Sequence, residues 1–173
     1  MTEVLEIIKY TLPAIIVLIV SVVFIKQIVK NDQNRRNYEI LTKNQQLITP
    51  VRLQAYERLT LLLERISPES LIMRVNKPNM TAKQLQSELL STIRSEFDHN
   101  VSQQIYVTPQ VWEMIKNARA KITQLVNGSA IRVKPDAPAI QLSKTILEDL
   151  MQIEKSPVSL ALDALKAEVK HLY

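Results

Sequence analysis

The chain has 173 residues, with 22 basic and 17 acidic side chains, no cysteine and a single glycine, Gly128. One glycine excludes the glycine-rich loops that hold nucleotide phosphates, and the lack of cysteine excludes disulfides and a thiol nucleophile. Acidic residues alternate with the basic ones and no recognition motif is present, so the small positive excess does not indicate a nucleic-acid-binding protein.

The first thirty residues predict a membrane anchor. Residues 10–25 carry no charge and lie between Lys9 and Lys26. As a helix this run rises about 24 Å, a little less than the roughly 30 Å of a hydrocarbon core, so apolar neighbours must extend it. We therefore expect residues 5–29 to contact the lipid bilayer, with the two lysines reaching the headgroups. Pro13 lies in the first turns of this helix, where a kink does least harm.

Two alternatives explain the apolar run less well. A cleaved signal peptide needs a basic start and a small-residue cleavage site, whereas Glu3 and Glu6 precede the run and Phe24 and Ile25 end it. A buried helix of a soluble protein needs a large domain around it, because residues 12–20 offer no polar face. An uncleaved anchor is therefore the favoured interpretation.

Basic residues next to the run predict its orientation. Lys9 precedes it, whereas Lys26, Lys30, Arg35 and Arg36 follow it. Positive residues near a span are retained in the cytoplasm, so we expect a single pass with the N-terminus outside and the C-terminal domain cytoplasmic. The same residues could contact anionic headgroups, although their effect on topology is sufficient to explain them. The lack of cysteine fits a reducing cytoplasm, but a cysteine-free periplasmic domain would look the same.

Three regions follow from these patterns: an anchor over residues 1–30, a polar juxtamembrane neck over 31–48 and a cytoplasmic α-helical domain over 49–173. The neck has too few apolar positions to sustain a coiled coil. Either a helical extension of the anchor or a mobile tether fits its composition.

Hydroxyl residues mark helix starts in the domain. Four of them directly precede a proline, at Thr49–Pro50, Ser67–Pro68, Thr108–Pro109 and Ser156–Pro157. The hydroxyl accepts a hydrogen bond from an unpaired backbone N–H, and proline at the first helical position lacks the donor that would be wasted there. Thr81 is a fifth start, with Gln84 completing a capping box. Gly128 is expected to end a helix.

Apolar periodicity predicts helices over residues 50–66, 81–106, 108–127, 140–153 and 156–172, with a short segment over residues 67–75 between the first two. The apolar stripes assigned to the core are Leu53, Tyr56, Leu59, Leu63 and Ile66; Leu85, Leu89, Ile93, Phe97 and Val101; Trp112, Ile115, Ile122, Leu125 and Val126; Ile140, Leu142, Ile146, Leu147, Leu150 and Ile153; and Val158, Leu162, Leu165, Val169 and Leu172. The predicted fold class is all-α: a transmembrane helix, a neck and a compact bundle of about five helices.

Two Glu-x-x-His pairs, Glu96 with His99 and Glu168 with His171, are the candidate metal ligands. Di-iron carboxylate bundles place such pairs on two helices and add a glutamate from each of two others. Helical spacing places these four residues beside the apolar stripes and not within them. We therefore expect solvated side chains, with no bound metal and no cofactor.

Several segments carry a family resemblance. They are Arg52-Leu-Gln-Ala-Tyr-Glu-Arg-Leu, Leu63-Glu-Arg-Ile-Ser-Pro, Met80-Thr-Ala-Lys-Gln-Leu-Gln and Glu96-Phe-Asp-His-Asn-Val-Ser-Gln-Gln-Ile-Tyr-Val. The chain resembles, over most of its length, an uncharacterised family of single-pass membrane-anchored helical proteins from Bacteroidota. This resemblance implies a bacterial inner-membrane setting and carries no activity or functional residue with it.

Two functional hypotheses follow. The first is a non-catalytic, membrane-anchored interaction module or accessory subunit of an inner-membrane assembly, which binds a protein partner or a second copy of itself. The second is a small membrane-held metal-binding protein or enzyme that uses the Glu/His pairs, and it requires a polar pocket with perturbed pKa values. We favour the first, because it explains the anchor, neck and domain without an active site.

Overall fold

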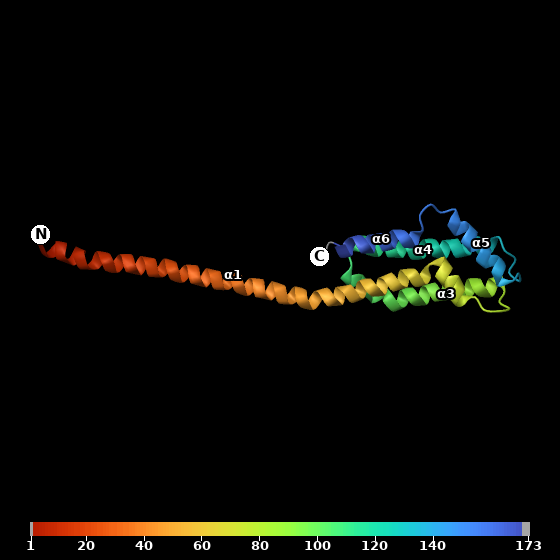
Figure 1. Cartoon of the computed structure of the whole chain (residues 1–173), viewed down its shortest axis with the longest axis horizontal. Helices are drawn as coiled ribbons and strands as arrows, with labels where there is room; N and C mark the ends of the chain where they lie inside the picture. The colour runs from red at the N-terminus through yellow and green to blue at the C-terminus, as the bar shows by residue number, and fades with distance from the viewer. Residues whose placement is uncertain (1, 171–173) are drawn as a thin grey trace. The chain divides into compact units, whose positions relative to one another are not determined.

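The computed structural model describes residues 2–170, apart from the side chains of residues 2–14, 37, 40, 41 and 44–47. The described residues form six α-helices and one 3₁₀ helix, with no β-strand among them (Figure 1). The elements are α1 (Thr2–Ile66), α2 (Pro68–Val75), α3 (Ala82–Asn100), η1 (Val101–Tyr106), α4 (Pro109–Ile131), α5 (Ala139–Met151) and α6 (Pro157–Lys170). The all-α class is confirmed, whereas the predicted count of about five helices is too low.

The chain divides into two compact units, Met1–Pro50 and Val51–Tyr173. In the first unit, every described side chain from residue 15 to residue 48 is exposed. The second unit contains the end of α1, all the other helices and the hydrophobic core.

Helix α1 passes through the Thr49–Pro50 pair, so the prediction of a helix start there is wrong. Residues 31–48, the predicted neck, are part of α1. Of the two alternatives for the neck, the structure therefore agrees with a helical extension of the preceding segment and not with a mobile tether. Between Pro13 and Pro50 the sequence contains no proline or glycine that would end the preceding helix. A proline inside a helix costs one hydrogen bond and about 3 kcal/mol, but a continuous run of helix formers can absorb this cost.

The other predicted helix starts are confirmed. Ser67 is the N-cap of α2, although its hydroxyl makes no capping hydrogen bond to a described residue. Thr81 and Gln84 form the predicted capping box of α3, with backbone-to-side-chain distances of 2.9 and 3.3 Å. Thr108 accepts a hydrogen bond at 3.4 Å from the backbone three residues on, and α6 begins at Pro157.

Two helix ends differ from the prediction. Helix α3 ends at Asn100 and tightens into η1, so the expected single helix over residues 81–106 is wrong. Helix α4 continues through Gly128 to Ile131. Gly128 is exposed and has no positive φ, so it occupies an ordinary helical position and does not act as a left-handed cap.

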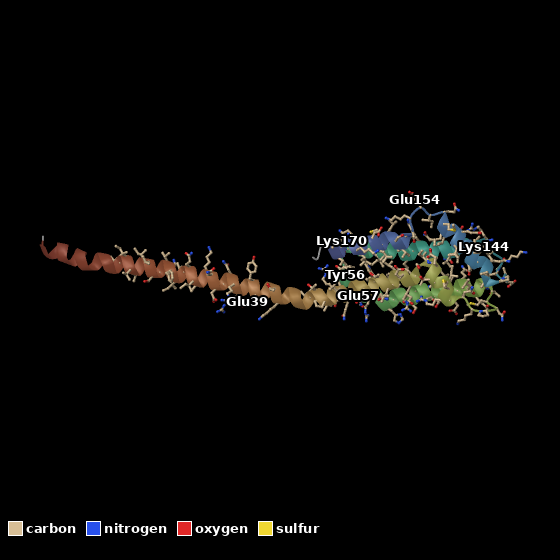
Figure 2. The ribbon with its side chains drawn as sticks, in the orientation of Figure 1. Glu39, Tyr56, Glu57, Lys144, Glu154 and Lys170 are labelled. Carbon is tan, nitrogen blue, oxygen red and sulfur yellow. The ribbon has the colours of Figure 1, made fainter. Side chains whose placement is uncertain are left out.

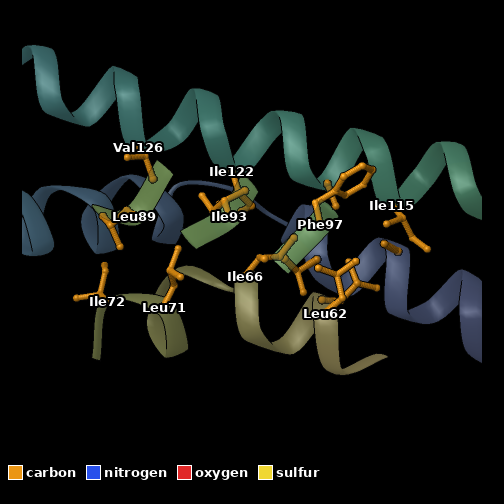
Figure 3. Close-up of a cluster of buried hydrophobic side chains, with 14 of the residues drawn as sticks. Leu62, Ile66, Leu71, Ile72, Leu89, Ile93, Phe97, Ile115, Ile122 and Val126 are labelled. Carbon is orange, nitrogen blue, oxygen red and sulfur yellow. The ribbon is translucent and has the colours of Figure 1, made fainter. Parts of the chain in front are cut away.

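The core of the second unit lies where the end of α1 and helices α2, α3, α4, α5 and α6 pack together, and α4 contacts α3, α5 and α6. Leu62 and Ile66 of α1, Leu71 of α2, Ile93 of α3 and Ile122 of α4 converge in one cluster (Figure 3). Most of the predicted stripe positions are buried. Exposed exceptions are Val101, Ile140 and Ile153, and Leu172 lies outside the described residues.

The loop between α4 and α5 caps the start of α3. The backbone N–H of Ala82 donates to the carbonyl oxygen of Ala137 at 2.8 Å, and that of Lys83 donates to Pro135 at 3.1 Å. The backbone N–H of Gln84 donates to the Thr81 hydroxyl, so the first-turn donors of α3 are satisfied within the protein.

A polar contact between Asp149 of α5 and the end of α4 joins these two helices. The Ser129 hydroxyl donates to Asp149 Oδ2 at 2.5 Å, and Arg132 forms an ion pair with the same oxygen. The Arg132 hydrogen bond, followed by that of Ser129, holds the pKa of the Asp149 carboxyl below its ordinary value.

We expect Asp149→Asn to reduce the acid sensitivity of the fold. Because the pKa of Asp149 is lowered in the folded state, its stabilisation is present above the unfolded-state pKa and is lost as the pH falls through the folded-state pKa. Arg132 is more than half exposed, so solvent screening limits the expected effect to about 1 kcal/mol. Urea unfolding of the native protein and the variant, near neutral pH and near pH 3, measures this difference. Equal losses of stability on acidification would contradict it.

Candidate functional site

Four of the basic residues predicted to lie beside the membrane, Lys26, Lys30, Arg35 and Arg36, are exposed on α1. Arg35 forms an ion pair at 3.2 Å with the carboxylate four residues later, and Arg36 forms one at 3.0 Å with the carboxylate four residues earlier. Lys26 and Lys30 are exposed, and the side chain of Lys9 lies outside those described. Exposed pairs at this spacing support a helix by a few tenths of a kcal/mol each.

Helix α1 exposes an apolar surface between Ile15 and Val29. The large apolar side chains at residues 15–20, 22–25, 28 and 29 are each 43–66% exposed. Such a continuous apolar surface is unusual on a monomeric soluble protein. Within the part of the chain that the structure describes, no helix is long and apolar enough to span a membrane. The side chains of residues 5–14, the beginning of the predicted lipid contact, lie outside this part.

Glu96 connects three helices. Arg65 Nε at the end of α1 lies 3.0 Å from Glu96 Oε1, and Arg74 of α2 approaches the same oxygen at 3.2 Å. Arg74 also donates to the Arg65 carbonyl oxygen at 3.2 Å, which satisfies an acceptor in the last turn of α1. This carboxylate therefore has a structural role between α1, α2 and α3.

His99 is exposed one turn after Glu96 on α3. Its Nδ1 lies 2.6 Å from the Ser95 carbonyl oxygen, and because a carbonyl oxygen only accepts, Nδ1 is the donor in this contact. No direct interaction joins it to the Glu96 carboxylate, which the two arginines hold.

Glu168 fastens α6 to the start of α4 and to α1. Its carboxylate accepts hydrogen bonds from the Thr108 backbone N–H at 3.0 Å, the Thr108 hydroxyl at 2.5 Å and the Tyr56 hydroxyl at 2.8 Å. Arg52 adds an ion pair at 3.5 Å. The Glu168 side chain is 10% exposed. Burial, reinforced by the Glu168 carboxylate, raises the pKa of Tyr56, whose position on α1 Figure 2 shows.

The two Glu-x-x-His pairs do not assemble into a metal site within the described residues, where no group of three or more histidine, aspartate or glutamate side chains could hold an ion. Glu96 and Glu168 are largely buried, which corrects the expectation of solvated side chains. Each is paired with arginine from another helix. His171 lies outside the described residues.

A groove between the end of α1 and the end of α3 is the site that sequence reasoning missed. It has a volume of about 520 Å³. Its lining residues are Arg58, Leu61, Leu62, Arg65, Ser95, Glu96, His99 and Asn100. The α1 positions are three or four residues apart, so the spacing marks one helix face, but nothing in the sequence indicates that α3 lies beside it.

The fold and its sites define an all-α protein with a helical bundle and an apolar N-terminal helical segment. The chain matches the protein family described as "Family of unknown function (DUF7935)" over residues 2–172, and it belongs to that family. This match is consistent with the resemblance to an uncharacterised family. No curated protein and no solved structure matches the chain.

Proposed function

We propose that the protein is a non-catalytic interaction module, or an accessory subunit, that residues 5–29 anchor in a bacterial inner membrane. The observation that carries the proposal is the exposed apolar surface of α1 from Ile15 to Val29. Residues 15–20 are consecutive, so their side chains point in all directions around the helix. A helix that is apolar on every side is typical of apolar surroundings.

The charges that flank this surface support a single pass with the C-terminal domain in the cytoplasm. Lys26 lies near the C-terminal end of this surface and Lys30, Arg35 and Arg36 follow it, as expected from the bias of positive residues towards the cytoplasmic side. Arg35 and Arg36 have carboxylate partners on the same helix face, but solvent-exposed pairs of this kind leave the positive charge at the surface.

The ion pairs and hydrogen bonds that hold the two largely buried glutamates support a non-catalytic role. A general acid and base must be able to reach a substrate, whereas Glu96 and Glu168 are held by arginine and hydroxyl groups. The metal-binding alternative has no specific observation in its favour.

Extraction of membranes at alkaline pH tests the anchor. We expect the full-length native protein to stay in the pellet and a double variant, Ile19→Lys with Val22→Lys, to enter the supernatant. Each lysine at the centre of a span costs about 2.5–3.5 kcal/mol of insertion free energy. Ile19→Leu with Val22→Leu is the matched control and should stay in the pellet. Release of the native protein by this treatment would contradict the anchor.

Purification in mild detergent tests the interaction role. We expect either a stoichiometric protein partner or self-association of the chain, as mass and light-scattering measurements would detect. A monomer without any partner would contradict an interaction module and would leave the anchor unaffected.

A further inference from the structure

We propose that the groove between α1 and α3 binds an amphipathic helix of a partner protein through acidic side chains seven residues apart. This inference rests on the proposed role as an interaction module and specifies the chemistry of the partner. Helices commonly bind in grooves between two other helices, with anchor side chains at spacings of three, four and seven.

The α1 wall offers two guanidinium groups on one helix face. Arg58 and Arg65 are seven residues apart, which is about 10.5 Å along the helix axis. Among the described residues, none forms an ion pair or hydrogen bond with the Arg58 side chain. Arg65 approaches Glu96 through Nε, and its terminal nitrogens make no hydrogen bond to a described residue. Both arginines can therefore receive further carboxylates.

An apolar side chain lies between the two arginines. Leu61 lines the groove and is 59% exposed, while its neighbour Leu62 is buried in the floor. A ligand that covered Leu61 would remove this apolar surface from water. The order charge, apolar group, charge along one face matches an amphipathic helix better than it matches a single small anion.

The groove carries an excess of positive charge. Among the described residues that line it, Glu96 is the single carboxylate, and Arg65 and Arg74 already share it. Arg58 and Arg65 against Glu96 leave one positive charge among these lining residues, Arg74 adds a second beside Glu96, and a concave surface concentrates their field. Guanidinium groups bind carboxylates in a bidentate geometry, so acidic side chains are the favoured partners.

The α3 wall supplies polar groups. Ser95, His99 and Asn100 line it. With Nδ1 of His99 turned to the Ser95 carbonyl, Nε2 is the nitrogen left to contact a bound ligand. These groups fit the polar flank of an amphipathic helix.

A synthetic helical peptide provides the probe. It has about 15 residues, two glutamates seven residues apart and leucine midway between them, and a scrambled peptide of the same composition is its control. Fluorescence anisotropy with the full-length protein in detergent measures affinity. We expect the ordered peptide to bind at least about tenfold more tightly than the scrambled one.

Arg58→Glu should weaken binding of the ordered peptide by about tenfold or more, since it replaces attraction by repulsion. Lys121→Glu is the matched control, because Lys121 is exposed on α4, lies outside the groove and has no ion pair with a described residue. Lys121→Glu changes the net charge by the same amount as Arg58→Glu and should leave the affinity for the ordered peptide unchanged. Thermal unfolding should show both variants folded, because the Arg58 side chain has no ion pair or hydrogen bond with a described residue that the substitution would break.

Four results would overturn the proposal. They are equal binding of the ordered and scrambled peptides, equal effects of the two variants, displacement of the peptide by millimolar inorganic phosphate alone, and Arg58-dependent binding to anionic lipid vesicles in place of the peptide. None of them alters the alkaline extraction of the native protein, so failure of this inference and failure of the membrane anchor are distinguishable.

Discussion

Ile146→Ala is expected to lower the free energy of unfolding by about 3 kcal/mol, because it removes a buried side chain and leaves a cavity. Ile146 is 0% exposed on the inner face of α5. The matched control is Ile140→Ala on the same helix, where the side chain is 65% exposed and the expected change is below about 0.5 kcal/mol. Trp112 is buried in the same core and is the single tryptophan, so its fluorescence during urea unfolding reports the difference.

This pair also tests the correction to the predicted face of α5. Apolar periodicity assigned both isoleucines to the core, whereas only Ile146 is buried. Equal destabilisation by the two alanine variants would restore the sequence-based assignment and contradict the orientation of α5 in the structure.

Glu168→Ala is expected to lower the free energy of unfolding by about 3 kcal/mol as well, through a different cause. It removes the acceptor for Thr108 and Tyr56 and the partner of Arg52. The Tyr56 hydroxyl, on a buried residue, would be left without an acceptor at a cost of about 1–3 kcal/mol, and the partly exposed Arg52 would lose a charged partner. The loss of these contacts should loosen α6 first, because Glu168 joins α6 both to α1 and to the start of α4.

Thermal unfolding of the full-length protein measures this effect. Glu154→Ala is the matched control: Glu154 is exposed between α5 and α6 (Figure 2) and has no ion pair with a described residue. We expect no measurable change in its Tm. Glu168→Gln keeps the shape and one acceptor oxygen, so its Tm should lie between those of the native protein and Glu168→Ala. A Tm for Glu168→Ala equal to that of Glu154→Ala would show that this network does not stabilise the fold.

The sequence was a good guide to those features that depend on neighbouring residues. Thr81 with Gln84 and Thr108 with its proline specify α-helix starts through contacts within one turn. The same kind of signal failed at Thr49–Pro50, because a hydroxyl–proline pair is compatible with a helix start and with a helix that simply continues. The prediction that Gly128 ends a helix was wrong for a related reason. A glycine cap requires a positive φ, which the residues after Gly128 do not impose.

The environments of Glu96 and Glu168 could not be predicted from spacing. Helical spacing placed both glutamates beside the apolar stripes, but their partners come from distant parts of the chain. Glu96 is paired with Arg65 and Arg74. Glu168 is paired with Arg52 and Tyr56. Whether a glutamate at the edge of a stripe is solvated or buried depends on which side chains of other helices face it, as the partners of Glu96 and Glu168 show. The groove depends in the same way on the packing of α1 against α3.

The loop that caps α3 has a consequence for the cooperativity of folding. The amides of Ala82 and Lys83 find their acceptors at Ala137 and Pro135, in a segment that follows all of α4. A chain truncated before this segment would leave those amides to water, and the first turn of α3 would fray. In return, the Ala139 amide at the start of α5 donates to the Met80 carbonyl oxygen at 2.9 Å. We therefore expect the start of α3 and the start of α5 to gain their protection from hydrogen exchange together, as parts of one cooperative unit rather than as independent helices.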